Sequence, residues 1–479
     1  MPKWWWVMVI FVAIVLRFGN YENRWVLNQD EGRDASIALY ANRQGVLPEV
    51  GSPASAGPFN FGPWYFWLIM FWERVLPIAM GPWIGFTLMS VVSVICFAKI
   101  GELLAGKRGM IITGLVSGVA VGQVNGAPDM LNTVIVGFGS AVAFVGMAQF
   151  MKKENLWWAL LVGVAVGWSV NVHFQSLGLL GLPLVMVLIN KFSIVKRLKI
   201  ALISGLGLLL TFMPMICFDL NRNGVWVRSV IDYYTVGVKR YYVPLRWLTE
   251  LKDFWPQLFG SVTVGVSNFG YLWLVLGMMV VILLWRKREK IDNFWLALGL
   301  SMLIQVILMR FYRGPRSGGY LYAFHGWIIL ISSWILINIH KFNQKIGIGL
   351  VLLVVSLALY SSIKEVVMYP SQAKTILAMK KEIDTRFGGN IRIFNYDNSN
   401  MIAMPMFYLY YFEKRVGEDG VALGFCNKEK YICPEGQIIE KRNYRVYKLD
   451  ELTDVMRFNQ LTPKYVYEIL MVNYGVNKK

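Results

Sequence analysis

The sequence predicts a mostly α-helical, polytopic membrane protein that carries a small α/β domain at its C-terminal end. Hydrophobic residues make up 56% of the 479 residues and charged residues only 16%, a balance that long apolar segments produce. Stretches of about 20 mostly apolar residues, the length that crosses a bilayer, number about eleven. They begin near residues 4, 82, 109, 129, 156, 176, 199, 270, 293, 320 and 347. We therefore expect about eleven transmembrane helices.

The charged residues predict how these helices are oriented. The formal net charge of +19 would also suit a nucleic-acid partner, but the basic residues gather in short turns between the apolar runs. The longer connections, residues 20–81, 217–269 and 310–319, hold most of the acidic residues outside the C-terminal part. Because basic turns stay on the inner side, we expect a cytoplasmic N-terminus and an extracytoplasmic C-terminal part in a bacterial-type plasma membrane.

The chain is expected to divide into a transmembrane domain, residues 1–363, and a C-terminal domain, residues 364–479. Hydrophobicity falls sharply at this boundary, and the remainder is long enough for one small domain. Within it, residues 375–387 have helical spacing, whereas residues 390–396 and 443–449 alternate as strands do. These patterns predict a small, extracytoplasmic α/β fold.

Two of the outer loops are large. The first, residues 20–81, contains an apolar helical stretch at 35–41 and an aromatic segment at 64–76 that is too short to cross a bilayer. Because tryptophan and tyrosine favour the membrane surface, we expect interfacial helices that lie on the outer face. The second, residues 217–269, carries a long aromatic and basic stretch.

Cys426 and Cys433 lie seven residues apart in the polar C-terminal part. An extracytoplasmic location would allow them to form a disulfide. A metal is the alternative use of such a pair, but no histidine or further cysteine lies near them in the sequence, so the disulfide is the favoured interpretation.

Acidic residues at the outer boundary of the membrane are the candidates for chemistry, because a carboxylate near hydrocarbon is costly unless it is paired or functional. Asp30 and Glu31 follow the first span, Asp129 precedes the fourth, and Asp219 follows the seventh. At a common depth these carboxylates could converge. A purely structural interpretation stays open for each, since Asp129 could begin a helix and Asp219 could stabilise a loop.

Three arginines in a short outer turn, Arg310, Arg313 and Arg316, are candidates for binding an anion. A guanidinium group suits phosphate because it offers paired donors. The alternative interpretation is that these side chains anchor the turn at lipid headgroups.

With these features the sequence resembles the polytopic glycosyltransferases of the C superfamily, in the branch that includes protein O-mannosyltransferases and the lipid A aminoarabinose transferase. The resemblance rests on Asp30 and Glu31 after the first span, the Ala38-Leu-Tyr-Ala helix, the Gly62-Pro-Trp-Tyr-Phe-Trp segment, and Asp129 at the mouth of a later span. It extends over residues 1–335 in topology.

The resemblance implies an inverting transfer of a sugar from a polyprenyl-phosphate carrier to a lipid, glycan or protein acceptor at the outer face, without nucleic acid. Asp30 would act as the general base on the acceptor hydroxyl, together with Glu31 and Asp129 as catalytic residues. Positive groups would stabilise the departing phosphate.

The sequence departs from this branch before the first aromatic segment. Where the branch often carries a basic residue, this chain has Phe61 followed by Gly62 and Pro63. The phosphate must then be bound elsewhere. The residues expected to bind substrate are Arg313, Arg316, Arg222, Asp219, Tyr65 and Tyr320.

Three questions stay open from the sequence. Asp30 with Asp129 or Asp219 could bind Mg²⁺ or Mn²⁺ through hard oxygen ligands, although nothing requires it. A transporter or flippase of lipid-linked saccharides would also need many spans and basic residues, although related halves and broken midplane helices are not visible. A structural or assembly partner with a receptor-like C-terminal part is the third alternative.

Overall fold

The structure is a computed structural model. It describes residues 4–54, 57–189, 192–235, 250–311, 318–368, 372–396, 400–428, 433–442, 444–449 and 458–469.

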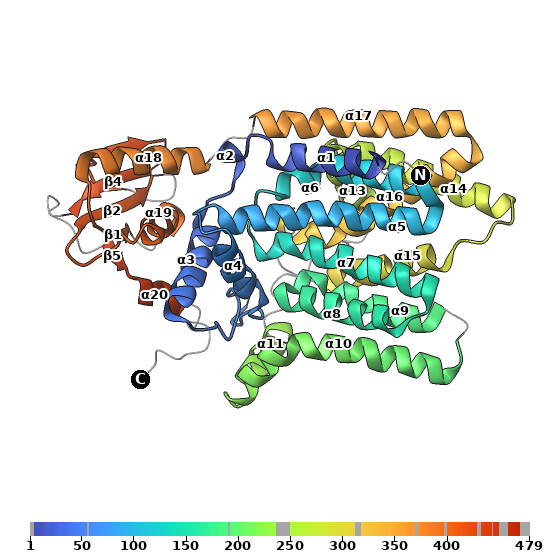
Figure 1. Ribbon diagram of the computed structural model, residues 1–479, viewed down its shortest axis with the longest axis horizontal. Helices are drawn as coiled ribbons and strands as arrows, with labels where there is room; N and C mark the ends of the chain where they lie inside the picture. The colour runs from blue at the N-terminus through green and yellow to red at the C-terminus, as the bar shows by residue number, and fades with distance from the viewer. Residues whose placement is uncertain are drawn as a thin grey trace.

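Most of the chain forms a bundle of roughly parallel and antiparallel helices (Figure 1). Six helices are long and apolar enough to cross a membrane, judged by length and composition within the described residues. They are α5 (Gly81–Val119), α7 (Asn132–Lys153), α10 (Ile194–Leu220), α14 (Phe269–Arg286), α16 (Tyr322–Phe342) and α17 (Gln344–Met368). Shorter apolar helical segments accompany them: α1 (Trp4–Phe18), α8 (Leu156–Val172), η1 (Phe174–Leu180) with α9 (Gly181–Ile189), and α15 (Asn293–Phe311).

The helices agree with the apolar pattern of the sequence. A helical segment begins within a few residues of every expected start except the one near residue 109, which falls inside α5. There the backbone of Ala105 and Gly106 leaves helical geometry, with φ of 61° at Gly106. Glycine adopts a positive φ at little cost, so it allows α5 to break between the two expected spans. The mostly helical membrane fold is confirmed, whereas the count of about eleven spans stays a prediction.

Small residues allow the helices to pack closely where α8 meets α10. A Cβ added at Gly163 would lie 2.0 Å from the carbonyl oxygen of Ser204, and one added at Gly207 would lie 2.5 Å from that of Leu160. Lipid tails are as apolar as the helices, so close backbone contact of this kind is what holds membrane helices together.

Shorter helices complete the bundle. They are α2 (Tyr21–Arg24), α3 (Gln29–Gln44), α4 (Trp64–Val75), α6 (Val121–Gly126), α11 (Val225–Thr235), η3 (Glu250–Phe254), α13 (Trp255–Val264) and η4 (Gly318–Leu321). The aromatic segment expected at the membrane surface is α4, and the apolar stretch before it belongs to α3.

The C-terminal part forms a five-stranded mixed sheet in the order β3-β4-β2-β1-β5. Strands β1 (Ile391–Tyr396) and β2 (Val421–Asn427) are parallel, and the other neighbours are antiparallel. The remaining elements are α18 (Gln372–Phe387), α19 (Asn400–Phe412), β3 (Ile439–Lys441), β4 (Tyr444–Lys448), β5 (Phe458–Leu461) and α20 (Pro463–Glu468). The helix and both strands expected from the sequence are present as α18, β1 and β4.

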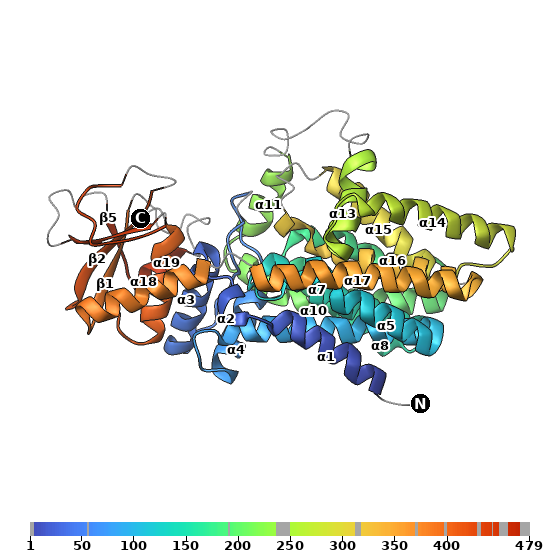
Figure 2. The ribbon, with the colours of Figure 1, turned by 90° about the horizontal axis from the view of Figure 1, so that it is seen from above.

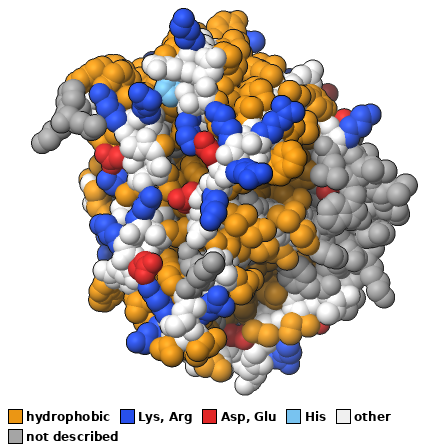
Figure 3. All heavy atoms as spheres, turned by 90° about the vertical axis from the view of Figure 1, so that its right-hand side faces the viewer, with side chains coloured by type: hydrophobic (Ala, Val, Ile, Leu, Met, Phe, Trp, Pro, Cys, Tyr) orange, Lys and Arg blue, Asp and Glu red, His pale blue; other side chains and the backbone are white. Residues whose placement is uncertain are grey.

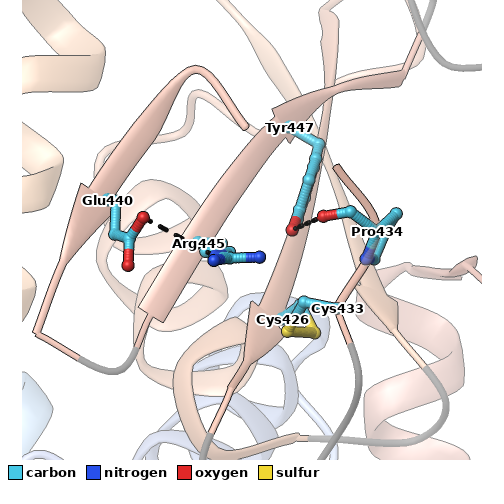
Figure 4. The surroundings of a disulfide bond; sticks show 6 residues. All are labelled: Cys426, Cys433, Pro434, Glu440, Arg445 and Tyr447. Carbon is cyan, nitrogen blue, oxygen red and sulfur yellow. Dashed lines mark hydrogen bonds and ion pairs between the residues drawn. A yellow bond between two sulfur atoms is a disulfide. The ribbon is translucent and has the colours of Figure 1, made fainter. Parts of the chain in front are cut away.

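Cys426 and Cys433 are joined by a disulfide, as favoured from the sequence (Figure 4). The bond ties the end of β2 to the segment that leads into β3. Beside it, the Tyr447 hydroxyl on β4 donates to the carbonyl oxygen of Pro434 at 2.7 Å. Both cysteines are buried in a small apolar cluster, so the disulfide is part of the core of this sheet.

The sheet lies at one end of the helix bundle, with α3 and α4 between them (Figures 1 and 2). The N-terminus lies at the opposite end of the bundle from the sheet. The first outer loop is therefore enclosed between the membrane helices and the C-terminal part. Which side of the membrane each end faces stays a prediction, as does the division into domains at residue 363.

Candidate functional site

The first site element is α3, which carries Asp30, Glu31, Arg33 and Asp34 in its first two turns. The helix begins after Asn28, whose backbone N–H donates to Glu31 Oε2 at 3.2 Å. Acidic side chains in a first turn also suit the positive end of the helix dipole. Local rules thus explain why the acidic run begins a helix, but not why Glu31 and Asp34 are buried.

The second site element is the connection between α6 and α7, which presents Asp129. It is held against the segment before α3: the backbone N–H of Val26 donates to the carbonyl oxygen of Pro128 at 3.0 Å. Two side chains of α5 reinforce this, because Trp83 Nε1 donates to the Val26 carbonyl at 2.6 Å and Thr87 Oγ1 to the Ala127 carbonyl at 2.7 Å. Segments about 100 residues apart in sequence are thereby fixed side by side.

Glu31 and Asp129 meet in this arrangement. Burial raises the pKa of Glu31 well above its ordinary value, and the negative charge of Asp129 raises it further. Burial also raises the pKa of Asp129, to about 7. Neighbouring carboxyl groups in a buried place hold a proton between them near neutral pH. Such a pair is costly for the fold and is typical of functional sites.

Arg33 joins the other two carboxyl groups of α3. Its Nη1 donates to Asp30 Oδ1 at 2.7 Å, and its Nε donates to Asp34 Oδ1 at 2.8 Å. Asp34 is buried and also accepts from the Ser52 hydroxyl at 3.0 Å. Asp30 instead keeps 57% of its side chain exposed. The cluster therefore has a buried, fully bonded side at Asp34 and one accessible carboxylate at Asp30.

Tyr65 of α4 lies beside the acidic cluster. Its side chain is fully buried, and its hydroxyl donates to the carbonyl oxygen of Met130 at 2.6 Å. Burial raises the pKa of Tyr65 well above its usual range, with further contributions from the charges of Asp34 and Glu31. A tyrosine held in this way stays a neutral hydrogen-bond donor.

A small cavity of about 20 Å³ adjoins Asp129. Ser90, Gln123 and Tyr322 also line it, and Asp129 Oδ1 is buried without a hydrogen-bond partner in the described part of the chain. The space suits one water molecule. It is too small for a sugar.

The C-terminal part packs directly on α3. A Cβ added at Gly32 would lie 2.7 Å from the backbone nitrogen of Pro405 in α19, a distance that real Cβ atoms do not show. Further along α3, Arg43 Nη2 donates to the carbonyl oxygen of Phe412, and its guanidinium lies 4.2 Å from the ring centre of Tyr411. The helix that carries the acidic residues is thus held on its other face by α19.

The structure brings together four of the residues expected from the sequence: Asp30, Glu31, Asp129 and Tyr65. Asp219 has a different environment, because its Oδ1 accepts the backbone N–H groups of Trp226 and Val227 at the start of α11. Those are the N–H groups that a helix leaves without partners. Asp219 therefore makes the helix-end contacts of the structural interpretation, and its expected role in binding substrate stays a prediction.

The remaining residues expected to bind substrate are Arg222, Tyr320, Arg313 and Arg316. Arg222 donates to Glu49 at 2.7 Å and lies over the ring of Phe218, so its charge is already partnered. Tyr320 lies in η4 with its ring 5.4 Å from that of His173. Arg313 and Arg316 lie outside the described residues, and their role stays a prediction.

Sequence reasoning did not single out Arg33 and Asp34. Their spacing from Asp30 was the available signal, because residues three and four positions apart lie on one face of a helix. In the residues that the structure describes, no group of three or more His, Cys, Asp and Glu side chains is arranged to hold a metal ion. Binding of Mg²⁺ or Mn²⁺ stays a prediction.

Comparison with known proteins shows which solved structures have a similar fold. No family model matches the chain, and no curated protein matches its sequence. Among solved structures, ArnT from Cupriavidus metallidurans in the apo state has a TM-score of 0.63 at 12% identity, over 93% of this chain and 97% of that one. The same protein bound to undecaprenyl phosphate has a TM-score of 0.55 at 13% identity, over 93% and 98%.

An oligosaccharyltransferase is similar as well. The enzyme from Archaeoglobus fulgidus, in complex with Zn and sulfate, has a TM-score of 0.51 at 11% identity, over 88% of this chain and 68% of that one. ArnT and this oligosaccharyltransferase are both members of the C superfamily of glycosyltransferases. The resemblance noted in the sequence is thus matched by a likeness of the whole chain, which has the fold of the C-superfamily membrane glycosyltransferases.

Proposed function

We propose that this protein is an inverting glycosyltransferase that transfers a sugar from a polyprenyl-phosphate carrier to an acceptor hydroxyl. The observation that carries the proposal is the acidic cluster: one accessible carboxylate, Asp30, is held by Arg33 beside the buried pair of Glu31 and Asp129. The fold supports it, since the likeness to glycosyltransferases extends over nearly the whole chain.

In this reaction Asp30 is the general base. The acceptor oxygen attacks the anomeric carbon on the face opposite the phosphate, and its proton passes to the Asp30 carboxylate. The bond between the anomeric carbon and the phosphate oxygen breaks, and polyprenyl phosphate leaves with the electron pair. A positioned base typically contributes 10²–10⁴-fold in rate. Asp30 suits the role because its side chain is 57% exposed and its orientation is held by Arg33.

The neighbouring groups position this base. Arg33 is itself fixed through Asp34, which the Ser52 hydroxyl holds from below. Glu31 and Asp129 share a proton beside Asp30, which limits the negative charge around the proposed base. Arg313 and Arg316, which precede α16 in the sequence, are the proposed phosphate ligands.

The donor class follows from the fold and from the lipid carried by a neighbour. ArnT has been solved with undecaprenyl phosphate bound, and that structure aligns with 93% of this chain. We propose a polyprenyl-phosphate sugar as the donor here, and a lipid, glycan or protein hydroxyl as acceptor, with the cluster on the outer side of a bacterial-type plasma membrane. None of the similar solved structures named above is a transporter, so the flippase alternative gains no support.

The test measures release of polyprenyl phosphate from a panel of synthetic polyprenyl-phosphate sugars. Purified wild type is incubated with membrane lipid extract as the acceptor source, beside Asp30→Asn. As a matched control, Asp419→Asn removes an exposed carboxylate from a turn of the C-terminal part. We expect release by wild type and by Asp419→Asn, and a loss of about 10²-fold or more in Asp30→Asn.

Release is compared only between purified proteins that are folded. Equal release by wild type and Asp30→Asn would remove Asp30 from the mechanism. Absence of release from every donor by folded wild type, followed by transbilayer movement of a labelled lipid-linked sugar in vesicles, would favour the transporter instead.

A further inference from the structure

The end of the bundle opposite the sheet contains a second polar cavity, of about 450 Å³. It lies between the break in α5, the connection from α14 to α15, and the last turns of α16. Figure 3 views this end of the molecule and shows many Lys and Arg side chains interspersed with hydrophobic ones. The polar residues that line the cavity are Arg108, Glu289, Lys290, Asp292, Asn338, His340 and Lys341.

The break in α5 helps to form this cavity. Ala105 lines it, and the non-helical backbone at Ala105 and Gly106 interrupts the helix just before Arg108. A Cβ added at Gly106 would meet no atom within 4 Å, so the turn faces open space.

The acidic residues of the cavity are already partnered. Glu289 forms an ion pair with Lys341, and Asp292 accepts the backbone N–H of Phe294 at the start of α15. Arg108 and Lys290 form no ion pair within the described part of the chain. Once Lys341 is paired with Glu289, the charged groups that remain are the two cations Arg108 and Lys290 and the carboxylate of Asp292, so the cavity keeps a net positive charge that suits an anion.

An apolar slot of about 280 Å³ continues from this cavity. The two spaces share Ile291, Trp295 and Trp334, and every other residue that lines the slot is Leu, Ile or Gly. The slot runs along α15 and α16, both apolar helices. A free phosphate or a soluble sugar phosphate would leave such a slot unfilled, whereas the hydrocarbon chain of a lipid would fill it.

We propose that this is a binding site for an anionic phospholipid, with the phosphate between Arg108 and Lys290 and one acyl chain in the slot beside Trp295 and Trp334. Basic pockets between membrane helices recognise acidic lipid headgroups in this way. The site is separate from the acidic cluster and does not depend on the proposed transferase function. If the N-terminus is cytoplasmic, the site faces the inner leaflet.

The test measures binding of tail-labelled phosphatidylglycerol and phosphatidylcholine to the full-length protein in detergent. The double variant Arg108→Gln and Lys290→Gln removes both free cations. The matched control, Lys152→Gln with Lys153→Gln, removes the same charge from exposed positions in the last turn of α7. We expect phosphatidylglycerol to bind more tightly than phosphatidylcholine, with affinity about tenfold lower in the first double variant and unchanged in the control.

A second variant tests the contribution of the lipid acyl chain independently of the headgroup. Gly299 lines the slot, and a Cβ there would meet no atom within 4 Å, so the side chain of Gly299→Leu begins in open space and occupies part of the slot. It should weaken binding of long-chain phosphatidylglycerol and leave the short-chain dihexanoyl lipid unaffected. Equal affinity for phosphatidylcholine, equal loss in the lysine control, or full competition by glycerol phosphate would each overturn the proposal.

Discussion

The buried pair formed by Glu31 of the first outer loop and Asp129 has the opposite environment to Asp219, the acidic residue that begins the second outer loop. Glu31 and Asp129 face one another in a buried place, and burial raises the pKa of both. Asp219 instead accepts two backbone N–H groups at the start of α11. A carboxylate that completes a helix end is explained by the fold alone. Two buried carboxyl groups held together are costly, so a function must account for them.

The two regions also differ in what covers them. The first-loop helix α3 lies between the membrane helices and α19, with Gly32 against the backbone of Pro405. The second loop is joined to the first by a partly exposed ion pair, Arg222 with Glu49, and by the hydrogen bond from Trp226 Nε1 to the carbonyl oxygen of Asn60. Exposed ion pairs contribute little stability, whereas close packing around α3 fixes side-chain positions. Preorganisation is therefore expected at the first loop and not at the second.

The largest expected effect is on activity, and it should differ between Asp129 and Asp219. Asp129→Asn should lower the rate of sugar transfer by about 10²-fold, because it removes one carboxyl group of the pair that supports Asp30. Asp219→Asn should leave the rate nearly unchanged. Release of polyprenyl phosphate by both purified variants measures this. A larger loss in Asp219→Asn than in Asp129→Asn would reverse the assignment of the site.

The second prediction concerns the packing of α3 on the C-terminal part. Gly32→Ala places a methyl group against the backbone of α19, and overpacking of this kind costs about 1–3 kcal/mol. We expect a lower thermal midpoint and reduced activity. Gly205→Ala in α10 is the matched control, since its Cβ would meet no atom within 4 Å. That control should be neutral or stabilising by about 0.5–1 kcal/mol. Similar midpoints for both variants would argue against the close contact.

The third prediction is a pH dependence of stability. The pKa values of Glu31 and Asp129 are raised in the folded protein, that of Asp129 to about 7, so the pair takes up protons on folding. Its contribution is fully present below pH of about 4, the ordinary carboxyl range, and is lost as pH rises through about 7. The thermal midpoint in detergent should fall across this window. The fall should be shallower in Asp129→Asn and unchanged in Asp419→Asn; equal slopes in all three proteins would contradict it.

The smallest expected effect is at the second loop. Asp219→Ala leaves two N–H groups of α11 without their acceptor, a loss typically worth about 1 kcal/mol. The thermal midpoint should fall slightly while activity is retained. A variant with normal stability and no activity would show that Asp219 acts on substrate, as the sequence had suggested.

Much of the fold could be predicted from apolar run length alone. The expected starts coincide with helical segments because a chain in lipid must satisfy its backbone hydrogen bonds internally, which only helices do here. The aromatic segment 64–76 was expected at the interface and forms α4. The strands β1 and β4 were visible as alternation. β2 was not, because it is buried along nearly its whole length, and β3 and β5, with three and four residues, are too short to show a period.

The sequence by itself determined the class of membrane protein, the acidic start of α3, and the candidates Asp30, Glu31 and Asp129, since composition, helix-start signals and cost in hydrocarbon are local properties. Only the tertiary structure decided which acidic residues meet. Glu31 and Asp129 are brought together by hydrogen bonds such as that from Val26 to Pro128, and Asp219 is used by its own helix. The physical reason is that burial and charge coupling depend on neighbours distant in sequence, which no local pattern contains.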